Sequence, residues 1–418
     1  MAEPAGPLAG TLLELEVGAV AHGGSCVARH AGRVVFVRHA LPGERVRARV
    51  TEDRGGAFCR ADAVEILVAS PDRVTPPCEY AGPGRCGGCD WQHASAAAQR
   101  DLKAAVVREQ FTRLAGLDVG GLLPGVAALP GGLLGWRTRV TYAVDADGRP
   151  GLHRHRSAEI EHVERCLIGA PGVGDAPALA DQWAGLSGIE AACGDDGAVT
   201  LLAHRPGRGR QPRGRRPPDS VRVVSGAPVL RRELRGRWFE VSAGSFWQVH
   251  PAAAAALAEA LLDAVRPGPG ERVLDLYAGA GAFTSVLAEA VGPSGAVLGI
   301  EAAPGAVADS VRNLADLPWA QVRRARVTAD TLADLADLDG GPHVVVLDPP
   351  RAGAGRDVMR AILELAPRTV GYVSCDPATL ARDVAVARDA GWRLSSLRAF
   401  DAFPMTQHVE CVASLHPG

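Results

Sequence analysis

The sequence predicts an α/β protein in three parts: an OB-like β-barrel, an α+β central domain and a doubly wound parallel sheet. Short strand-like runs broken by glycine turns come first, a cysteine cluster follows, and strand and helix patterns alternate beyond about residue 241. The chain has 418 residues, and a domain usually takes about 100 to 200. We therefore expect domains at 1–70, 71–240 and 241–418.

The composition excludes several classes of protein. The formal net charge of -2 gives no global sign of a polyanionic partner, but residues 200–240 carry eleven arginines against three acids. The first residues lack a basic-then-apolar pattern, and no stretch of about 20 apolar residues occurs. We therefore expect a cytoplasmic monomer with no membrane partner. Nine cysteines without an export signal favour metal binding or catalysis over disulfides.

Residues 12–68 alternate apolar and polar side chains in short runs. Turns are indicated at His22-Gly-Gly, Leu41-Pro-Gly and Arg54-Gly-Gly. Short strands between such turns are typical of a small β-barrel. The run at 32–44, GRVVFVRHALPGE, resembles the TRAM module, which is an RNA-binding barrel. A generic barrel without a ligand is the alternative.

Three cysteines cluster at the start of the central region. Seven residues separate Cys78 from Cys86, two separate Cys86 from Cys89, and Cys166 follows after 76 more. One distant fourth cysteine commonly completes a four-iron cluster, so we expect a 4Fe-4S site on these four thiols. A structural zinc site more often uses two close pairs, and zinc and free thiols remain alternatives. The cysteines without such neighbours are interpreted as packed residues: Cys26, Cys59, Cys193 and Cys411.

The rest of the central region is predicted to hold one helix and several strands. Residues 94–114 have helical periodicity without internal Gly or Pro, and a Gly/Pro-rich tether runs from there to residue 135. The loop from Arg205 to Arg216 is either a solvated insertion or an adjustable phosphate contact. Strand patterns follow the tether at 136–144, 151–155 and 199–203.

Beyond about Ser242 the alternating pattern indicates a parallel sheet with helices on both faces. The expected strands lie at 272–277, 296–301, 322–328, 343–348, 370–375, 395–400 and 409–415. The expected helices lie at 252–265, 282–291, 304–315, 354–366 and 377–390.

The first strand of this sheet leads into a candidate cofactor loop. It runs into Gly279-Ala-Gly281 and then a helix, but Thr284 stands where a dinucleotide loop has its third glycine. Glu301 ends the next strand, where an acid can hold both ribose hydroxyls, and Asp330 follows the third strand, within reach of an adenine edge. This set favours S-adenosylmethionine over a pyrophosphate ligand. A generic doubly wound domain is the alternative.

The fourth strand ends in Asp348-Pro-Pro-Arg351, in the crevice where such sheets bind ligands. Enzymes that methylate amino groups carry an aromatic residue after this Pro-Pro to stack the target base. Because Arg351 stands there, methylation of an exocyclic nitrogen is disfavoured. Arg351 is left to anchor a carbonyl or phosphate, or to pair with Asp348.

Cys375, at the end of an apolar strand, is the candidate nucleophile. Asp376 is predicted to cap the following helix and Pro377 to occupy its first position. The thiol would then lie beside a helix amino terminus, whose dipole favours a thiolate. A buried strand-end cysteine is the alternative reading.

These residues make the chain similar to the RNA uracil-5-methyltransferase family, in its iron-sulfur, TRAM-containing branch. The resemblance implies that Cys375 attacks the base, that Glu410 is the general base, and that the helix after Trp91 packs on the catalytic domain. It implies cofactor contacts from Gln248, Tyr277, Glu301 and Asp348. The resemblance covers nearly the whole chain, and its motifs are the four clustered cysteines, FWQV at 246–249, DLY at 275–277 with Gly279 and Gly281, DPPRAG at 348–353, SCDPATLARD at 374–383 and FPMTQHVE at 403–410.

Four positions depart from the family pattern. Ala278 stands where Cys is usual, and Ala282 stands where an Asn can contact the cofactor. His250 and Asp376 each replace a usual Asn. Ala282 puts one cofactor contact in doubt, and Asp376 adds a negative charge that opposes thiolate formation at the nucleophile.

The chemistry of uracil gives an independent reason for a cysteine and an acid. Carbon 5 is too weak a nucleophile to take a methyl group unaided, but addition of Cys375 to carbon 6 makes the ring an enolate. Glu410 would then remove the carbon 5 proton. The base must leave its stack, so an RNA loop is the expected substrate. We expect 23S ribosomal RNA, because the family's transfer-RNA branch typically lacks both the TRAM module and the cluster. An idle RNA-binding iron-sulfur protein, a transfer-RNA enzyme and a cytosine-5 enzyme are the alternatives.

Overall fold

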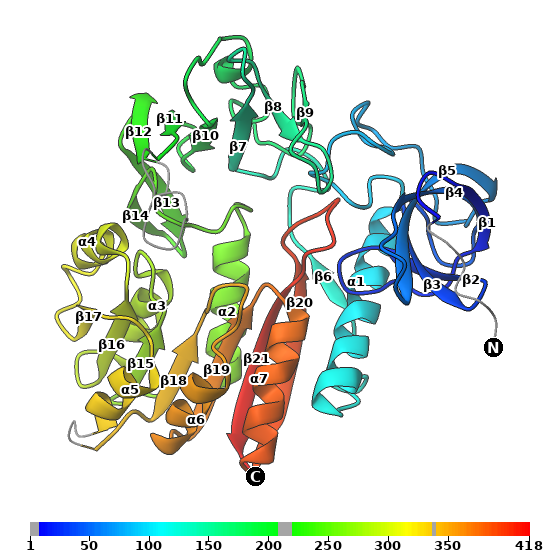
Figure 1. The fold of residues 1–418 in the computed structure, drawn as a ribbon. Coiled ribbons are helices and arrows are strands. Elements are labelled where there is room, and N and C mark those ends of the chain that lie inside the picture. The colour runs from blue at the N-terminus through cyan, green and yellow to red at the C-terminus, as the bar shows by residue number, and fades with distance from the viewer. Residues whose placement is uncertain (1–7, 208–219, 337–339) are drawn as a thin grey trace.

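The computed structural model describes residues 8–207, 220–336 and 340–418. The barrel and the parallel sheet lie on opposite sides of helix α1 (Ala96–Gln110), and the central sheet lies beyond the end of the parallel sheet (Figure 1). Most of the loop predicted from Arg205 to Arg216 lies outside the described residues. Within the described ranges, no helix has the length and apolar character needed to cross a membrane.

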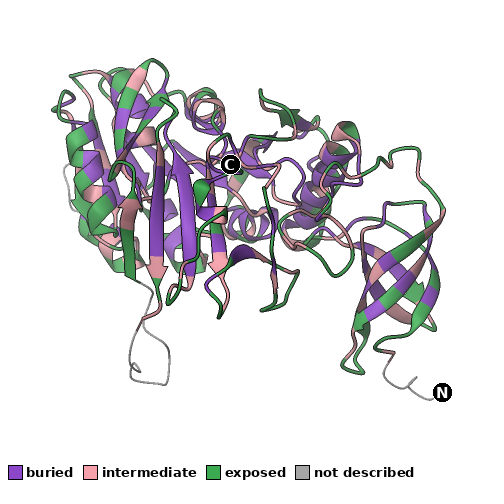
Figure 2. Cartoon of the chain, turned by 90° about the horizontal axis from the view of Figure 1, so that it is seen from above, coloured by how far each residue is buried: buried purple, intermediate pink, exposed green. Residues whose placement is uncertain are grey.

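Residues 12–68 form a five-stranded barrel sheet in the order β1-β4-β5-β3-β2. The burial of successive residues alternates along its strands, and the inward side chains, such as Val35 and Val46, are completely buried (Figure 2). The alternation seen in the sequence thus marks the two faces of each strand. The strands are β1 (Leu12–Glu16), β2 (Cys26–His30), β3 (Arg33–Arg38), β4 (Arg45–Glu52) and β5 (Phe58–Val68).

The central domain is built on a six-stranded sheet in the order β12-β11-β10-β7-β8-β9. A separate hairpin, β13 (Val229–Leu234) and β14 (Arg237–Ser242), packs through Phe239 and Val241 into the core of the catalytic sheet. The other elements are β7 (Arg139–Val144), β8 (Pro150–His153), β9 (Ile160–Glu161), the short 3-10 helix Pro177–Leu179, β10 (Gly188–Cys193), β11 (Val199–Arg205) and β12 (Ser220–Ser225).

The catalytic sheet has eight strands in the order β17-β16-β15-β18-β19-β21-β20-β6, and β21 runs antiparallel to both of its neighbours. Its central strands are buried along their length, as Figure 2 shows. The strands are β6 (Val126–Ala128), β15 (Arg272–Leu276), β16 (Ala296–Glu301), β17 (Ala320–Arg324), β18 (Val344–Leu347), β19 (Thr369–Ser374), β20 (Trp392–Asp401) and β21 (Glu410–Pro417). The helices are α2 (Ala253–Val265), α3 (Ala282–Val291), α4 (Pro304–Asn313), α5 (Ala329–Ala336), α6 (Arg356–Glu364) and α7 (Pro377–Asp389).

Strand β17, helix α5 and strand β6 differ from the sequence prediction. The strand expected at 322–328 is β17 at Ala320–Arg324, and helix α5 occupies residues for which no element was predicted. Strand β6 comes from the Gly/Pro-rich tether and pairs with β20 at the edge of the sheet. A strand of three residues has no periodicity of its own, so only its tertiary pairing reveals it.

Helix α1 joins two hydrophobic cores. Ser95 caps it by accepting a hydrogen bond from the Ala98 amide, at 3.2 Å. Leu102 and Val106 pack into the barrel core, whereas Val107 and Phe111 pack into the catalytic core. The helix therefore buries more than one face and fixes the barrel against the catalytic sheet.

Candidate active site

The candidate nucleophile and general base lie at the same end of the catalytic sheet. Cys375 directly follows β19, and Glu410 begins the neighbouring antiparallel strand β21. Ser374 pairs with Cys411 in the antiparallel register. Cys375, which follows Ser374, is therefore adjacent to Glu410, which precedes Cys411. Asp348 follows the parallel strand β18, whose carboxyl end lies at this same edge. Three predicted site residues therefore meet where ligands of such sheets bind.

The surroundings of Cys375 favour the neutral thiol. Burial raises its pKa to about 12, and the carboxylates of Glu410, Asp348 and Asp376 add to this effect, whereas Arg351 opposes it. The pKa of the thiol is therefore raised, and not lowered as its position beside the amino terminus of α7 predicted. Burial and three nearby carboxylates outweigh the helix terminus.

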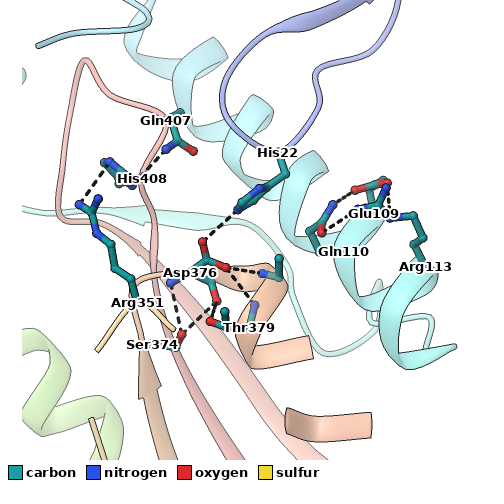
Figure 3. Close-up of polar contacts among 11 residues, drawn as sticks. His22, Glu109, Gln110, Arg113, Arg351, Ser374, Asp376, Thr379, Gln407 and His408 are labelled. Carbon is teal, nitrogen blue, oxygen red and sulfur yellow. Dashed lines mark hydrogen bonds and ion pairs between the residues drawn. The ribbon is translucent and has the colours of Figure 1, made fainter. Parts of the chain in front are cut away.

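Asp376 caps helix α7 as predicted. Its Oδ1 accepts hydrogen bonds from the amides of Ala378 and Thr379, at 3.0 and 2.9 Å. Its Oδ2 lies 3.1 Å from Nε2 of His22, which belongs to the barrel (Figure 3). Burial tends to raise the pKa of Asp376, but these hydrogen bonds outweigh it and hold the pKa below its usual value.

Glu410 is a buried acid with spare hydrogen-bonding capacity. Its side chain is 3% exposed, and its Oε2 has no hydrogen-bond partner among the described residues. Burial, followed by the charge of Asp348, raises its pKa well above the usual value, while Arg351 lowers it. Buried polar atoms of folded proteins are rarely left unpaired, so this one indicates a functional group.

The candidate cofactor loop is a strained turn between β15 and α3. Tyr277, Gly279 and Gly281 all have positive φ angles, of 65°, 56° and 88°. The Gly279 amide donates to Oε2 of Glu301 at 3.0 Å, which joins the loop to the end of β16. The turn therefore brings Gly279 and Glu301 into direct contact, as expected of a loop that folds around a ligand.

Two further acids give this edge of the sheet a negative character. Asp275 is 1% exposed and its Oδ1 has no hydrogen-bond partner in the described parts of the chain. Burial raises its pKa to about 7, and Glu301 adds to that effect. Burial likewise raises the pKa of Asp348 to about 7, with Asp275 contributing. Closely spaced acids of this kind suit a ligand that brings positive charge.

The two remaining predicted cofactor residues make no hydrogen bond to this network in the described parts of the chain. Gln248 is half-buried in the segment between β14 and α2. Asp330 is exposed in the first turn of α5. Within residues 220–336 and 340–418, the structure gives neither side chain a hydrogen bond or ion pair with the loop.

The four cysteines predicted to bind a cluster line one cavity of about 40 Å³ in the central domain. Burial raises the pKa of Cys86 to about 11, and the nearby thiols of Cys166 and Cys78 add to this effect. Across the described ranges, no three metal-ligating side chains are close enough to hold a single metal ion. The 4Fe-4S cluster therefore stays a prediction.

A larger groove, of about 930 Å³, lies between the barrel and the β8–β9 hairpin. It is rich in arginine and also contains an aromatic side chain, Phe36. One of its lining residues, His22, is the same residue that contacts Asp376. Its basic lining residues are His22, Arg38, Arg54, Arg60, Arg154, His155 and Arg156.

Sequence reasoning missed three polar residues whose contacts surround the active site. His22 appeared only as part of a turn, and Lys103, the single lysine of the sequence, was given no role. His408, 3.4 Å from the Arg351 guanidinium, lay inside a motif but was given no role. Burial, followed by the charge of Arg351, lowers the pKa of His408 to about 4. No local signal marks these residues, because their partners are distant in sequence.

The sequence matches two family descriptions, TRAM domain over residues 8–64 and tRNA (Uracil-5-)-methyltransferase over residues 227–416. A 23S rRNA (uracil(1939)-C(5))-methyltransferase of Chromohalobacter salexigens is 35% identical, with 96% of this chain and 88% of the relative aligned. The chain belongs to the RNA uracil-5-methyltransferase family. It is thus an RNA (uracil-5-)-methyltransferase, with the TRAM domain that the sequence predicted.

A further relative and one solved structure are similar to this uracil-5-methyltransferase over nearly its whole length. A protein of Streptomyces avermitilis described as an RNA methyltransferase is 48% identical over 97% of this chain and 98% of its own. Among solved structures, the tRNA (uracil-54, C5)-methyltransferase of Pyrococcus abyssi, in complex with S-adenosyl-L-homocysteine, superposes with a TM-score of 0.69. It is 21% identical and covers 96% of this chain and 100% of its own, so it supports the fold.

Proposed function

We propose that this enzyme transfers a methyl group from S-adenosylmethionine to carbon 5 of a uridine in 23S ribosomal RNA, with Cys375 as nucleophile and Glu410 as general base. The observation that carries the proposal is the position of both side chains at one edge of the sheet, where the charge of Glu410 acts on Cys375. The unpaired Oε2 of buried Glu410 supports it.

The two side chains act in turn on the uracil ring. The Cys375 thiol loses its proton to solvent and the thiolate adds to carbon 6, so that the π electrons move to carbon 5 as an enolate. S-Adenosylmethionine, when bound, supplies the methyl group that carbon 5 takes from the sulfonium. Glu410 accepts the carbon 5 proton, the double bond re-forms, and the sulfur–carbon 6 bond breaks to release the thiolate.

The electrostatics of the site suit these roles. The raised pKa of Glu410 makes its carboxylate a stronger base than an exposed glutamate. Arg351 lowers the pKa of both Glu410 and Cys375, so its guanidinium stabilises both anions of the cycle. A uracil base bound in this crevice would contact Arg351. Enzymes that methylate amino groups carry an aromatic ring at this position.

The negative edge of the sheet is the proposed cofactor site. Asp348 and the acids beside it would stabilise the sulfonium, and Glu301 would bind the ribose next to the Gly279 turn. The same proposal assigns Gln248 and Tyr277 to contacts with the cofactor and Asp330 to its adenine. The buried acids fit a cation, which is the observation that favours this cofactor.

The arginine-rich groove is the proposed RNA path. Its guanidinium groups would bind phosphates, and Phe36 offers a face on which a base can stack. The TRAM match and the Chromohalobacter salexigens relative support ribosomal RNA as the substrate. A transfer RNA substrate is tested by offering both RNAs and mapping 5-methyluridine in each.

We further propose that Cys78, Cys86, Cys89 and Cys166 hold a 4Fe-4S cluster with a structural role. All four thiols line one cavity of the central domain, and this shared cavity is the observation that supports the proposal. A bound cluster would cross-link the segment at 78–89 to the central sheet.

The covalent step is tested with RNA that carries 5-fluorouracil at the target. Fluorine replaces the proton that Glu410 removes, so the wild-type protein should accumulate a protein–RNA adduct that survives denaturing electrophoresis. Cys375→Ala should form no adduct, whereas Cys59→Ala, which changes a buried barrel cysteine, should form it normally. An adduct that persists in Cys375→Ala would refute the nucleophile, and the absence of any methyl transfer by the wild type would favour an idle RNA-binding protein.

A further inference from the structure

The barrel places one side chain against Asp376, the residue that follows the nucleophile. His22 lies in the turn between β1 and β2, and its Nε2 is 3.1 Å from Oδ2 of Asp376, the residue after Cys375 (Figure 3). The two residues are 354 positions apart in the chain. The side chains are 35% and 24% exposed, so the contact lies at the mouth of the site and is partly shielded from solvent.

The turn that carries His22 is fixed in place. Trp91 donates from Nε1 to the Gly24 carbonyl at 2.9 Å. Gly24 has a φ of 82° and packs so closely on Gln407 that a Cβ on Gly24 would lie 2.7 Å from the Cβ of Gln407. Asp90 in turn accepts a hydrogen bond from the Gln407 amide at 3.0 Å. Three segments are therefore packed together: the barrel turn at Gly24, the residues Asp90 and Trp91 that follow the clustered cysteines, and the loop before Glu410.

The two carboxylate oxygens of Asp376 have separate partners. Oδ1 accepts from the first amides of α7, whereas Oδ2 faces only His22 among its described partners. Asp376 adds negative charge beside Cys375, in a site that already contains Glu410 and Asp348 and has Arg351 as its cation. A hydrogen-bonded imidazole reduces the effect of that charge on the thiol.

We propose that His22 is a positioning residue of the methyl-transfer reaction, supplied by the RNA-binding barrel. It holds Asp376 in its capping geometry and offsets its charge, so that Cys375 ionises more readily. This inference rests on the proposed role of Cys375. His22 also lines the basic groove, so the surface that binds RNA and the nucleophile share one residue.

The test measures the reactivity of Cys375 directly. Wild type, His22→Ala, Asp376→Asn and the double variant are treated with iodoacetamide over a range of pH, without RNA or methyl donor, and alkylation of Cys375 is followed by peptide mass analysis. His22→Ala should lower the rate about three- to tenfold at pH 8, because a partly exposed pair shifts an equilibrium by less than about 1.4 kcal/mol. Asp376→Asn keeps a capping side chain and removes the charge, so it should raise the rate.

The double variant decides between electrostatics and packing. If His22 acts through Asp376, then His22→Ala should have no effect in the Asp376→Asn background. An equal loss in both backgrounds, or an unchanged profile in His22→Ala, would overturn the proposal. His22→Gln retains a donor and should recover part of the rate, and His30→Ala, on the same barrel, is the control. Adduct formation with 5-fluorouracil RNA, measured on the same variants, separates this result from a failure of Cys375 as nucleophile.

Discussion

The ammonium group of Lys103 lies 2.5 Å from the carboxylate of Asp401, and both side chains are buried. Lys103 belongs to α1, and Asp401 ends β20. Lys103 also donates to the Phe403 carbonyl at 3.0 Å. The single lysine of the chain therefore fixes the start of the loop that leads to Glu410, and it does so from a helix that also packs on the barrel.

Lys103→Met should destabilise the protein strongly. The substitution leaves the Asp401 carboxylate buried without its partner, which typically costs about 3–5 kcal/mol. Urea unfolding should show that loss, and Lys103→Met with Asp401→Asn should recover part of it. Arg113→Met removes an exposed ion pair between the π-helix Phe111–Ala115, which follows α1, and Glu109 of α1, and should change stability by less than about 1 kcal/mol. An equal loss of unfolding free energy in the two variants would show that the buried ion pair stabilises the protein no more than the exposed one.

Glu410→Gln should trap the reaction after methyl transfer. The glutamine cannot accept the carbon 5 proton, so turnover should fall about 10²- to 10⁴-fold while the methylated adduct with ordinary RNA accumulates. Denaturing electrophoresis and mass analysis of the adduct would measure this. Glu364→Gln changes an exposed acid on α6 and serves as the control. Lost turnover without any adduct would instead assign Glu410 to an earlier step.

Glu301→Gln should weaken cofactor binding. It replaces the carboxylate that accepts from the Gly279 amide and is proposed to bind the ribose. The affinity for S-adenosylhomocysteine, measured by calorimetry, should fall about 10- to 100-fold, as expected when a hydrogen bond to a charged group is lost. Asp330→Asn should give a smaller loss and Asp334→Asn, on the exposed side of the same helix, none. Equal affinities for Asp330→Asn and Asp334→Asn would remove Asp330 from the site.

Cys89→Ser should lower the iron and sulfide content of protein purified without oxygen. Because Cys89 packs with Met405, and the next residue, Asp90, holds Gln407, loss of the site should also loosen the loop before Glu410. Hydrogen exchange at residues 402–409 should rise, and this readout is independent of activity. Cys193→Ala, a buried cysteine of the same domain, should change neither quantity. Zinc in place of iron and sulfide would refute the cluster.

The double variant Arg54→Gln, Arg156→Gln should bind RNA more weakly, and its affinity should depend less on salt concentration. Both arginines line the groove and are proposed to contact phosphates. Losing two such contacts should reduce the slope of log affinity against log salt by about 1 to 2. Arg47→Gln, on the barrel outside the groove and paired with Glu14 and Glu65, should leave the slope unchanged. An equal decrease in Arg47→Gln would place the RNA elsewhere.

The sequence alone determined the features whose causes are local. Three features depend on residues within a few positions of one another. They are the strand–turn–helix of the cofactor loop, the strands of the barrel and the Asp376 cap of α7. Backbone conformation, side-chain alternation and capping act over that range, so their patterns are visible in the sequence. The family motifs further indicated that Cys375 and Glu410 belong together.

Only the tertiary structure decided the contacts between distant segments and the charge state they create. His22 meets Asp376, Lys103 meets Asp401, and β6 joins the sheet edge through partners hundreds of residues away. The pKa of Cys375 was also decided by the tertiary structure. Burial and the surrounding carboxylates raise it, although the thiol lies beside a helix amino terminus. Electrostatic energy depends on distance and burial in space, and a linear sequence gives neither for residues that folding alone brings together.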